Sequence, residues 1–300
     1  MRTLILGIGA QKSGTTWLFK QLLKSKNFKP GLVKEYQLFN VLFENVINEQ
    51  SDAIEKIPLR VKNSPFIKNT KQNLDAQNLL KSFYQNYQNY FNYIDGILND
   101  ENSFTTDITP SYALLPVEAF YLIQNELKKR DIGLKVVYFM REPVTRAESA
   151  IKMHFRRQGV LDKISNKEVL PELVKNLSNI ALLNRGNYKS TCARLESVIS
   201  AENIFYGFYE TLFSKSEMSR LAEFLSVDKK TFDIEQKINK SGYRFKYKSR
   251  DIKKLKELTS EQYQFVQSKF GFDIALWHQA CDKIIDQSWF DKIISKNKFL

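Results

Sequence analysis

The segment LILGIGAQKSGTTW occupies residues 4–17. It begins as a short apolar run, continues as a loop bounded by Gly9 and Gly14, and ends where apolar residues recur at helical spacing, which predicts a strand, a phosphate-binding loop and a helix. The interval between the two glycines is that of a nucleotide P-loop, but Thr15 and Thr16 stand where P-loop enzymes have Lys followed by Ser or Thr. The lysine lies at Lys12 instead. The segment therefore predicts an anionic nucleotide and chemistry other than that of an ATPase.

The composition is that of a globular chain with a basic surface. Of 300 residues, 43% are hydrophobic and 26% are charged, and the net charge is +13. These fractions are ordinary for a globular protein. The lysines are spread along the chain, and no zinc-finger or helix-turn-helix spacing occurs, so nucleic acid is not expected as a partner. We interpret the excess charge as a solvated surface that includes a cleft for anions.

Cysteine usage and hydropathy indicate a cytoplasmic protein that is not an integral membrane protein. Cys192 and Cys281 are far apart and lack the spacing of a metal site, which indicates reduced thiols. No apolar stretch approaches the length of a membrane span. The N-terminal apolar run is interrupted by Gly7 and Gly9 and leads into the loop, so we interpret it as a strand and not as a signal peptide.

Strands and helices alternate along the chain. Residues 1–35 predict a strand, a loop, a helix and a second short strand near Leu32 and Val33, and residues 134–140 and 203–208 predict buried strands that are each followed by a helix. This alternation predicts an α/β fold of three layers, in which a P-loop-like, mostly parallel sheet is flanked by helices. We expect a single domain over residues 1–300.

Residues 36–104 differ from the rest of the chain. They are rich in Asn, Gln, Lys, Tyr and Phe and contain no convincing strand. Between Phe83 and Ile94, aromatic residues recur three and four positions apart, which predicts an amphipathic helix whose aromatic face packs into a core. We interpret residues 36–104 as a mainly helical insertion.

A second anion-binding pattern begins at Arg141, directly after the second predicted strand. In an NTPase such a strand ends in an Asp that helps to hold Mg²⁺. Arg141 attracts an anion and cannot ligate a metal. Ser149 follows two helical turns later, so the pair predicts a binding site for a second phosphate. The alternative is that Arg141 and Arg146 merely pair with Glu142 and Glu148 on the surface.

Two phosphate-binding sites without a metal ligand suit a nucleotide with phosphate at both ends of its ribose. The sequence here resembles the sulfotransferase family that uses 3′-phosphoadenosine 5′-phosphosulfate (PAPS). QKSGTTWL at residues 11–18 is similar to the 5′-phosphosulfate loop of that family, and REPVTRAES at residues 141–149 is similar to its 3′-phosphate motif. KEYQLF at residues 34–39 and DITPSY at residues 107–112 resemble segments of the carbohydrate, heparan-type branch, with Asp and Ile replacing the Glu-Lys that begins the second segment.

The resemblance implies PAPS as donor, 3′-phosphoadenosine 5′-phosphate as product and no metal ion. It implies that Lys12 contacts the bridging and sulfuryl oxygens, that Arg141 and Ser149 hold the 3′-phosphate, and that Lys240 and Ser241 close over it. The backbone amides that hold the 5′-phosphate would be those of Ser13, Gly14, Thr15, Thr16 and Trp17.

An acceptor hydroxyl needs a base, and the resemblance gives this role to Glu35, with Lys34 and Asp107 as substrate-binding residues. A carboxylate within hydrogen-bond reach of the hydroxyl in a cleft of low dielectric suits this chemistry. The alternative for Glu35 is an ordinary ion pair with Lys34. A histidine base, as in cytosolic small-molecule sulfotransferases, would have to be His154 or His278, which we interpret as structural.

The leading hypothesis is a metal-free, in-line transfer of a sulfuryl group to a hydroxyl of a saccharide or glycolipid. By its position, the insertion at residues 36–104 would shape the acceptor side of the cleft. One alternative is a P-loop nucleotide kinase or NTPase, which predicts turnover of ATP that depends on Mg²⁺. Another is a non-catalytic polyanion-binding protein, which predicts tight, salt-sensitive binding of nucleic acid.

Overall fold

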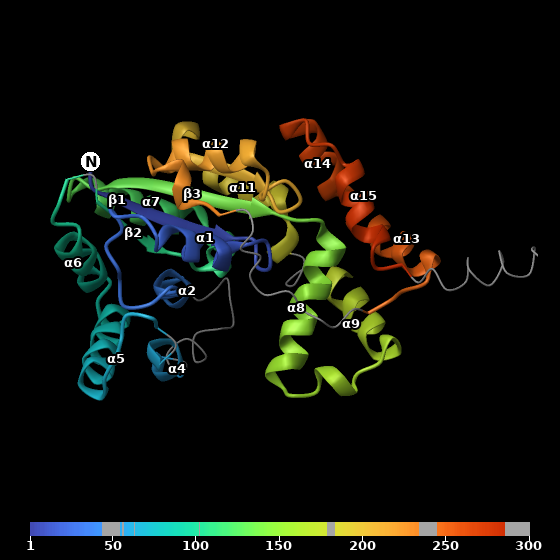
Figure 1. Cartoon of the computed structure of the whole chain (residues 1–300), viewed down its shortest axis with the longest axis horizontal. Helices are drawn as coiled ribbons and strands as arrows, with labels where there is room; N and C mark the ends of the chain where they lie inside the picture. The colour runs from blue at the N-terminus through green and yellow to red at the C-terminus, as the bar shows by residue number, and fades with distance from the viewer. Residues whose placement is uncertain are drawn as a thin grey trace, which may run out of the picture. The chain divides into compact units, whose positions relative to one another are not determined.

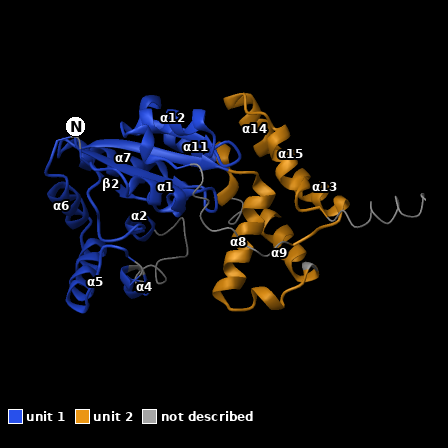
Figure 2. Ribbon diagram, in the orientation of Figure 1, with its two compact units in different colours: residues 1–140, 190–238 blue, residues 141–189, 239–300 orange. Residues whose placement is uncertain are grey.

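The computed structural model describes residues 1–43, 55, 57–62, 64–101, 103–178, 184–233 and 245–285. The chain divides into two compact units, which are coloured separately in Figure 2. Unit 1 comprises residues 1–140 and 190–238, and unit 2 comprises residues 141–189 and 239–300. The single domain expected over residues 1–300 stays a prediction.

Unit 1 is built on a four-stranded parallel sheet. Its strands are β1 (Thr3–Gly9), β2 (Phe104–Asp107), β3 (Gly133–Met140) and β4 (Ile204–Phe208), and their order is β2-β1-β3-β4. Leu6 of β1 lies opposite Asp107 of β2 and Val136 of β3. Parallel strands are covered on both faces and are therefore nearly continuous in apolar residues, as β1 and β3 are. The predicted α/β fold with a parallel sheet flanked by helices is confirmed.

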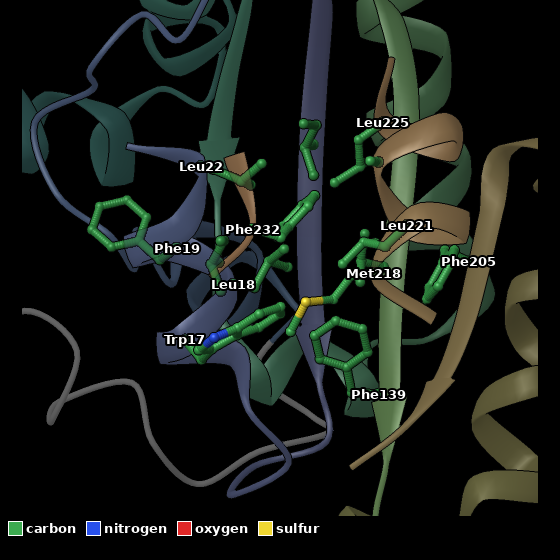
Figure 3. Close-up of a cluster of buried hydrophobic side chains, with 14 of the residues drawn as sticks. Trp17, Leu18, Phe19, Leu22, Phe139, Phe205, Met218, Leu221, Leu225 and Phe232 are labelled. Carbon is green, nitrogen blue, oxygen red and sulfur yellow. The ribbon is translucent and has the colours of Figure 1, made fainter. Parts of the chain in front are cut away.

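Helices α1 (Thr15–Leu22) and α12 (Lys215–Leu225) cover one face of this sheet. Their apolar residues form one buried cluster with Ile5, Phe139 and Phe205 of the strands. Figure 3 shows Phe139 and Phe205 with side chains of both helices. Neighbouring strand residues point to the opposite face. There the Tyr206 hydroxyl donates to Glu196 of α11 (Tyr188–Glu196), and α7 (Val117–Lys128) packs against β3.

The region between α1 and β2 contains α2 (Leu38–Leu42), α4 (Ile57–Lys62), α5 (Thr70–Gln85) and α6 (Gln88–Ile97) (Figure 1). The prediction of one helix across residues 83–94 was wrong, because the aromatic residues are shared between α5 and α6. Asn86 has an extended backbone and its side-chain oxygen accepts the amide of Gln88 at 3.0 Å, which ends one helix before the next begins.

The short strand predicted near Leu32 and Val33 was also wrong. The Leu32 amide donates to the Tyr36 hydroxyl at 3.0 Å, and the Leu32 carbonyl accepts from the Ser64 hydroxyl at 2.5 Å. These side chains supply the partners that a neighbouring strand would give. The isolated parallel bridge in this part of the chain lies earlier, between Phe28 and Phe104.

Unit 2 is helical in its described residues. It contains α8 (Pro143–Arg157), α9 (Asn166–Ser178), α13 (Ser249–Leu258), α14 (Ser260–Phe270) and α15 (Ala275–Asp282). A second buried cluster joins α8, α9, α13 and α15, with Ile151 of α8, Leu173 of α9 and Leu255 of α13 among its members. Throughout the described part of the chain, every helix is too short or too polar to cross a membrane.

Truncation of Leu221 tests the packing of α12 on the sheet. Leu221 is fully buried in the cluster of Figure 3, so Leu221→Ala leaves a cavity and should lower the free energy of unfolding by about 2–5 kcal/mol in urea denaturation. Leu74→Ala is the matched control, because Leu74 is 56% exposed on α5 and its loss should change stability by less than about 0.5 kcal/mol. Equal effects of the two substitutions would contradict this packing.

Candidate functional site

The loop after β1 has a backbone that glycine makes possible. Gly9 and Gly14 have φ angles of +135° and +102°, which side chains rarely allow. A Cβ at Gly9 would lie 2.8 Å from the Pro110 carbonyl oxygen, and a Cβ at Gly14 would lie 2.9 Å from Leu212 Cδ2. Lys12, between them, is half-buried and also has a positive φ of +73°. The loop therefore has a fixed shape that presents Lys12.

The N-terminus of α1 is open to an anion. No side chain among the described residues caps it, and its first amide bonded within the helix is that of Leu18, which donates to the Gly14 carbonyl at 3.1 Å. The amides of Thr15, Thr16 and Trp17 form the first turn, which has no earlier turn to supply carbonyl partners. The Ser13 hydroxyl is fully buried and has no hydrogen-bond partner among the described residues. A phosphate at this helix end would supply what these groups lack.

The Trp17 side chain belongs to the core of unit 1. It is 2% exposed, its ring stacks on Phe232 with centroids 5.6 Å apart, and Phe213 meets it edge-on at 5.4 Å. Trp17 therefore fixes α1 against the rest of unit 1, while its backbone amide lies in the first turn of the helix.

Glu35 lies in a segment that is bonded to the end of β2. The Ile108 amide donates to the Lys34 carbonyl at 2.8 Å, and the Tyr36 amide donates to Asp107 Oδ1 at 3.3 Å. Since β2 is parallel to β1 and next to it, the residues that follow both strands emerge at the same edge of the sheet. The fold thus brings Glu35 to the sheet edge that carries the Lys12 loop.

The Glu35 carboxylate has a cationic neighbour. Lys34 Nζ lies 2.7 Å from Glu35 Oε1, and the side chains are 19% and 36% exposed, respectively. The ion pair considered as an alternative from the sequence is therefore present. Its partial exposure leaves the Glu35 carboxylate accessible, so the pair is compatible with a role for Glu35 as a base.

Asp107 lies inside unit 1, which disagrees with a substrate-binding role. It is fully buried, and its carboxylate accepts hydrogen bonds from Thr109 Oγ1 at 2.6 Å, Tyr112 OH at 2.8 Å, Tyr90 OH at 3.3 Å and the Tyr36 amide. A substrate contact needs an accessible atom, and this carboxylate has none. Burial raises the pKa of Asp107 to about 6, although the hydrogen bonds to its oxygens act in the opposite direction.

Arg141 and Ser149 belong to unit 2, at the start of α8 and two turns into it. The N-terminus of α8 is occupied, because the Glu142 carboxylate accepts the amides of Val144 at 2.9 Å and Thr145 at 2.6 Å. An anion near α8 therefore has to be held by side chains. Arg141 and Ser149 are both half-buried, and their role in holding an anion stays a prediction.

Tyrosine hydroxyls hold the turn that carries Arg141. Tyr188 donates to the Arg141 carbonyl at 2.5 Å, and Tyr263 donates to Glu142 Oε1 at 2.7 Å. Of the carboxylates in the alternative pairing, Glu142 caps the helix and Glu148 forms an ion pair with Lys152 at 2.9 Å. Burial raises the pKa of Glu148, while the charges of Lys152 and Arg141 act in the opposite direction, so the pairing of Arg141 with Glu148 stays open.

The remaining positions considered from the sequence are Lys240, Ser241 and the two histidines. Lys240 and Ser241 lie outside the described residues. The His278 ring stacks on Tyr263 with centroids 5.3 Å apart, and His154 is exposed beside Phe155 on α8. Both histidines are exposed, and the structural role expected for them stays a prediction.

The net charge is unevenly shared between the units. Unit 2 contains 23 Lys and Arg against 12 Asp and Glu, a net charge of +11, so only +2 remains on the larger unit 1. Each unit contains 23 Lys and Arg, so the excess on unit 2, which carries Arg141 and Ser149, comes from its smaller number of Asp and Glu. An excess of this size attracts anions to unit 2.

The sequence did not reveal the residues that hold the predicted site residues in place. They are Tyr90 and Tyr112, which donate to Asp107, and Tyr188 and Tyr263, which hold the turn at Arg141. Tyr90 was visible only as part of an aromatic periodicity. A tyrosine in such a pattern gives no sign of where its hydroxyl is bonded.

Comparison with known proteins gives a consistent result. A family model described as a sulfotransferase domain matches residues 2–273. The structure is similar to that of a sulfotransferase from Alicyclobacillus acidocaldarius, with 17% identity, a TM-score of 0.55 and coverage of 93% of this chain and 99% of that chain. At this identity the likeness shows the fold.

Two further solved structures are similar at lower TM-scores. The sulfotransferase domain from the curacin biosynthetic pathway has 18% identity and a TM-score of 0.43, over 80% of this chain and 78% of that chain. The sulfotransferase domain from the Synechococcus PCC 7002 olefin synthase has 15% identity and a TM-score of 0.43, over 78% of this chain and 74% of that chain. No curated protein matches the sequence.

The buried Asp107 carboxyl should make stability depend on pH. Folded protein keeps this proton up to pH of about 6, whereas the unfolded chain loses it near pH 3.8, so ionisation in the folded state costs about 3 kcal/mol. The free energy of unfolding should therefore fall by this amount as the pH rises from 4 to 7. Asp107→Asn should lack this fall in the free energy of unfolding, which urea denaturation at pH 4 and pH 7 can measure. An equal dependence on pH in the parent and the variant would contradict the prediction.

Gly14→Ala should weaken the binding of adenosine 3′,5′-bisphosphate. The added Cβ is strained at φ +102° and meets Leu212, so the first turn of α1 has to move. A loss of about 1.4 kcal/mol corresponds to a tenfold rise in Kd by calorimetry. Gly271→Ala is the matched control, because Gly271 has a φ of +60° and open space around it. It should lose stability but keep its affinity, and an unchanged Kd in Gly14→Ala would contradict the site.

Proposed function

Since the chain belongs to the sulfotransferase domain family, we propose that it moves the sulfuryl group of PAPS to a hydroxyl of a saccharide, on a polysaccharide or a glycolipid. The observation that carries this proposal is the contrast between two helix N-termini. Within the part of the chain that the structure describes, the N-terminus of α1 has no side-chain cap, whereas Glu142 already fills that of α8. Backbone amides are thus left for one phosphate and side chains for another.

The donor would lie with its 5′-phosphosulfate at the start of α1. Amides from Ser13 to Trp17 and the buried Ser13 hydroxyl would hold the phosphate, with Lys12 beside the group that is transferred. Arg141 and Ser149 would hold the 3′-phosphate, together with Lys240 and Ser241. The donor carries several negative charges, which suits the net charge of +11 on unit 2.

The transfer itself is an in-line displacement at sulfur. Glu35 accepts the proton of the acceptor hydroxyl while the acceptor oxygen forms a bond to sulfur. The bond between sulfur and the bridging oxygen of the donor breaks, and the ammonium of Lys12 stabilises the negative charge that develops on the phosphate. The products are a sulfate ester and adenosine 3′,5′-bisphosphate, and no step needs a metal ion.

A saccharide is proposed as acceptor because the segment that begins with Lys34 and Glu35 resembles the carbohydrate branch. The helical region from residue 36 to residue 104 would shape the acceptor side, since Tyr36, which follows Glu35, packs on Phe83 of α5 and Tyr90 of α6. Lys34 would orient the acceptor from its place beside Glu35. Both cysteines are buried free thiols, which suits the cytoplasm as the place of reaction.

The polyanion-binding alternative gains one observation, the concentration of positive charge on unit 2. Calorimetry separates it from sulfuryl transfer. Adenosine 3′,5′-bisphosphate should bind without Mg²⁺ and should compete with any bound nucleic acid. Binding of DNA or RNA that the bisphosphate does not displace would favour the alternative.

Transfer of radiolabelled sulfate from PAPS to a panel of p-nitrophenyl glycosides and polysaccharides tests the reaction. Lys12→Ala should lower kcat by about 10²–10³ because the leaving group loses its cation. Lys20→Ala is the matched control, since Lys20 is exposed on the same helix. Full activity of Lys12→Ala, or failure of the parent chain to label any member of the panel, would contradict the proposal.

Glu35→Gln tests the base. Loss of a general base should lower kcat by about 10²–10⁴ and leave the affinity for adenosine 3′,5′-bisphosphate unchanged. Glu118→Gln, at an exposed position on α7, serves as control. Retention of kcat by Glu35→Gln would move the role of base to another residue.

A further inference from the structure

Residues 34–37, here called the Glu35 segment, have no strand or helix of their own, yet most of their backbone groups are bonded. The Lys34 carbonyl accepts from the Ile108 amide, and the Tyr36 carbonyl accepts from the Tyr84 hydroxyl at 2.6 Å. The Gln37 amide donates to Thr109 Oγ1 at 3.4 Å. The segment is thus fixed on both sides of Glu35 by partners far away in the sequence.

Asp107 joins these anchors into one network. Its Oδ1 accepts from both the Tyr36 amide and Thr109 Oγ1, and Thr109 Oγ1 in turn accepts from the Gln37 amide. Its Oδ2 accepts from Tyr90 and Tyr112, which orient the carboxylate from the other side. Every one of these groups lies in unit 1, on the strand next to β1 or against its end.

We propose that Asp107 is a positioning residue, whose carboxylate holds the Glu35 segment at the edge of the sheet where the Lys12 loop begins. This inference rests on the proposed function, because it assigns Asp107 an effect through Glu35. Asp107 takes no part in proton transfer and does not touch the acceptor.

A base is effective only at the right place. A displacement of about 1 Å at a reacting group can cost about 10² in rate. The Tyr36 side chain is 1% exposed and packed among aromatic rings, whereas Glu35 is half-exposed, so the segment pairs a buried anchor with an accessible carboxylate. Loss of the Asp107 contacts would release the backbone beside Glu35 while the sheet stays paired.

Buried carboxylates are costly, which is why the one at Asp107 calls for an explanation. A simple packing role could be filled by an apolar residue at lower cost. An acceptor with several lone pairs can join a backbone amide and three hydroxyls at one point, and an apolar side chain cannot.

Hydrogen exchange measured by mass spectrometry tests the positioning directly, without an acceptor. Thr109→Val removes the hydroxyl that links Asp107 to Gln37, and Asp107→Ala removes the carboxylate that joins the anchors. In both variants a peptide covering residues 34–38 should exchange about tenfold faster or more, because local opening becomes easier, while a peptide from β3 keeps its protection. Asp107→Asn retains an acceptor oxygen and should restore most of the protection.

Thr105→Val is the matched control for Thr109→Val. Thr105 lies on β2, and its buried hydroxyl has no hydrogen-bond partner among the described residues. Its removal should leave exchange in the Glu35 segment unchanged. If Asp107→Ala does not fold, Thr109→Val and its control still decide the question. Unchanged exchange in Thr109→Val, or the same acceleration in Thr105→Val, would overturn the positioning role.

A double-mutant cycle tests the effect through Glu35. With the p-nitrophenyl glycoside that the parent chain labels fastest, Thr109→Val should lower kcat by about tenfold and leave KM for PAPS unchanged. In the Glu35→Gln background the same substitution should cause no further loss, because the group being positioned is absent. If the losses in kcat from Thr109→Val and Glu35→Gln multiply in the double variant, the inference is overturned.

The two proposals fail in different ways. If Glu35→Gln retains full activity, Glu35 is not the base and the catalytic part of the inference fails with it, whatever the exchange data show. If Glu35→Gln is inactive and Thr109→Val is fully active, the proposed function stands and the positioning role of Asp107 is wrong. If the parent chain labels no glycoside, the proposed function fails and the exchange data still decide what holds the Glu35 segment.

Discussion

The pairing of β1 between β2 and β3 is the constraint on which the described site in unit 1 depends. Leu6 faces Asp107 on one side and Val136 on the other, and this register sets where the loops leave the sheet. Because parallel strands end at the same edge, the loop with Lys12 and the turn after Asp107 emerge together. A slip of one residue would turn each side chain of β1 to the opposite face. The core of Figure 3 therefore also fixes the chemistry at the sheet edge.

The strands and the first loop could be predicted because their signals are local. Buried parallel strands are short apolar runs, and β1 and β3 fit that pattern at nearly every position. The aromatic periodicity before residue 94 was misleading, since it continues across the break at Asn86. The hydrogen bond between the Asn86 side chain and the Gln88 amide ends α5 there, and the spacing of apolar residues does not predict such a bond.

The role of Asp107 could not be predicted because its partners come from distant parts of the chain. Tyr36 lies 71 residues before it in the Glu35 segment, and Tyr90 lies 17 residues before it on α6. Only the fold brings them to one carboxylate. The charge distribution is a similar case, since both units contain 23 Lys and Arg, and the net charges of +2 and +11 arise because unit 1 contains 21 Asp and Glu and unit 2 contains 12. A linear sequence shows residue types, and the topology determines which of them meet.

Glu142 gives α8 an anion of its own, and this has a consequence for how the chain can evolve. At α1 the groups available to an anion are main-chain amides, which most point mutations leave in place. At α8 they are side chains, because Glu142 fills the helix end, and a single codon change can remove or replace each of them. If the donor is held as proposed, descendants of this chain can change its recognition at α8 by single substitutions, while recognition at α1 remains inherited with the backbone.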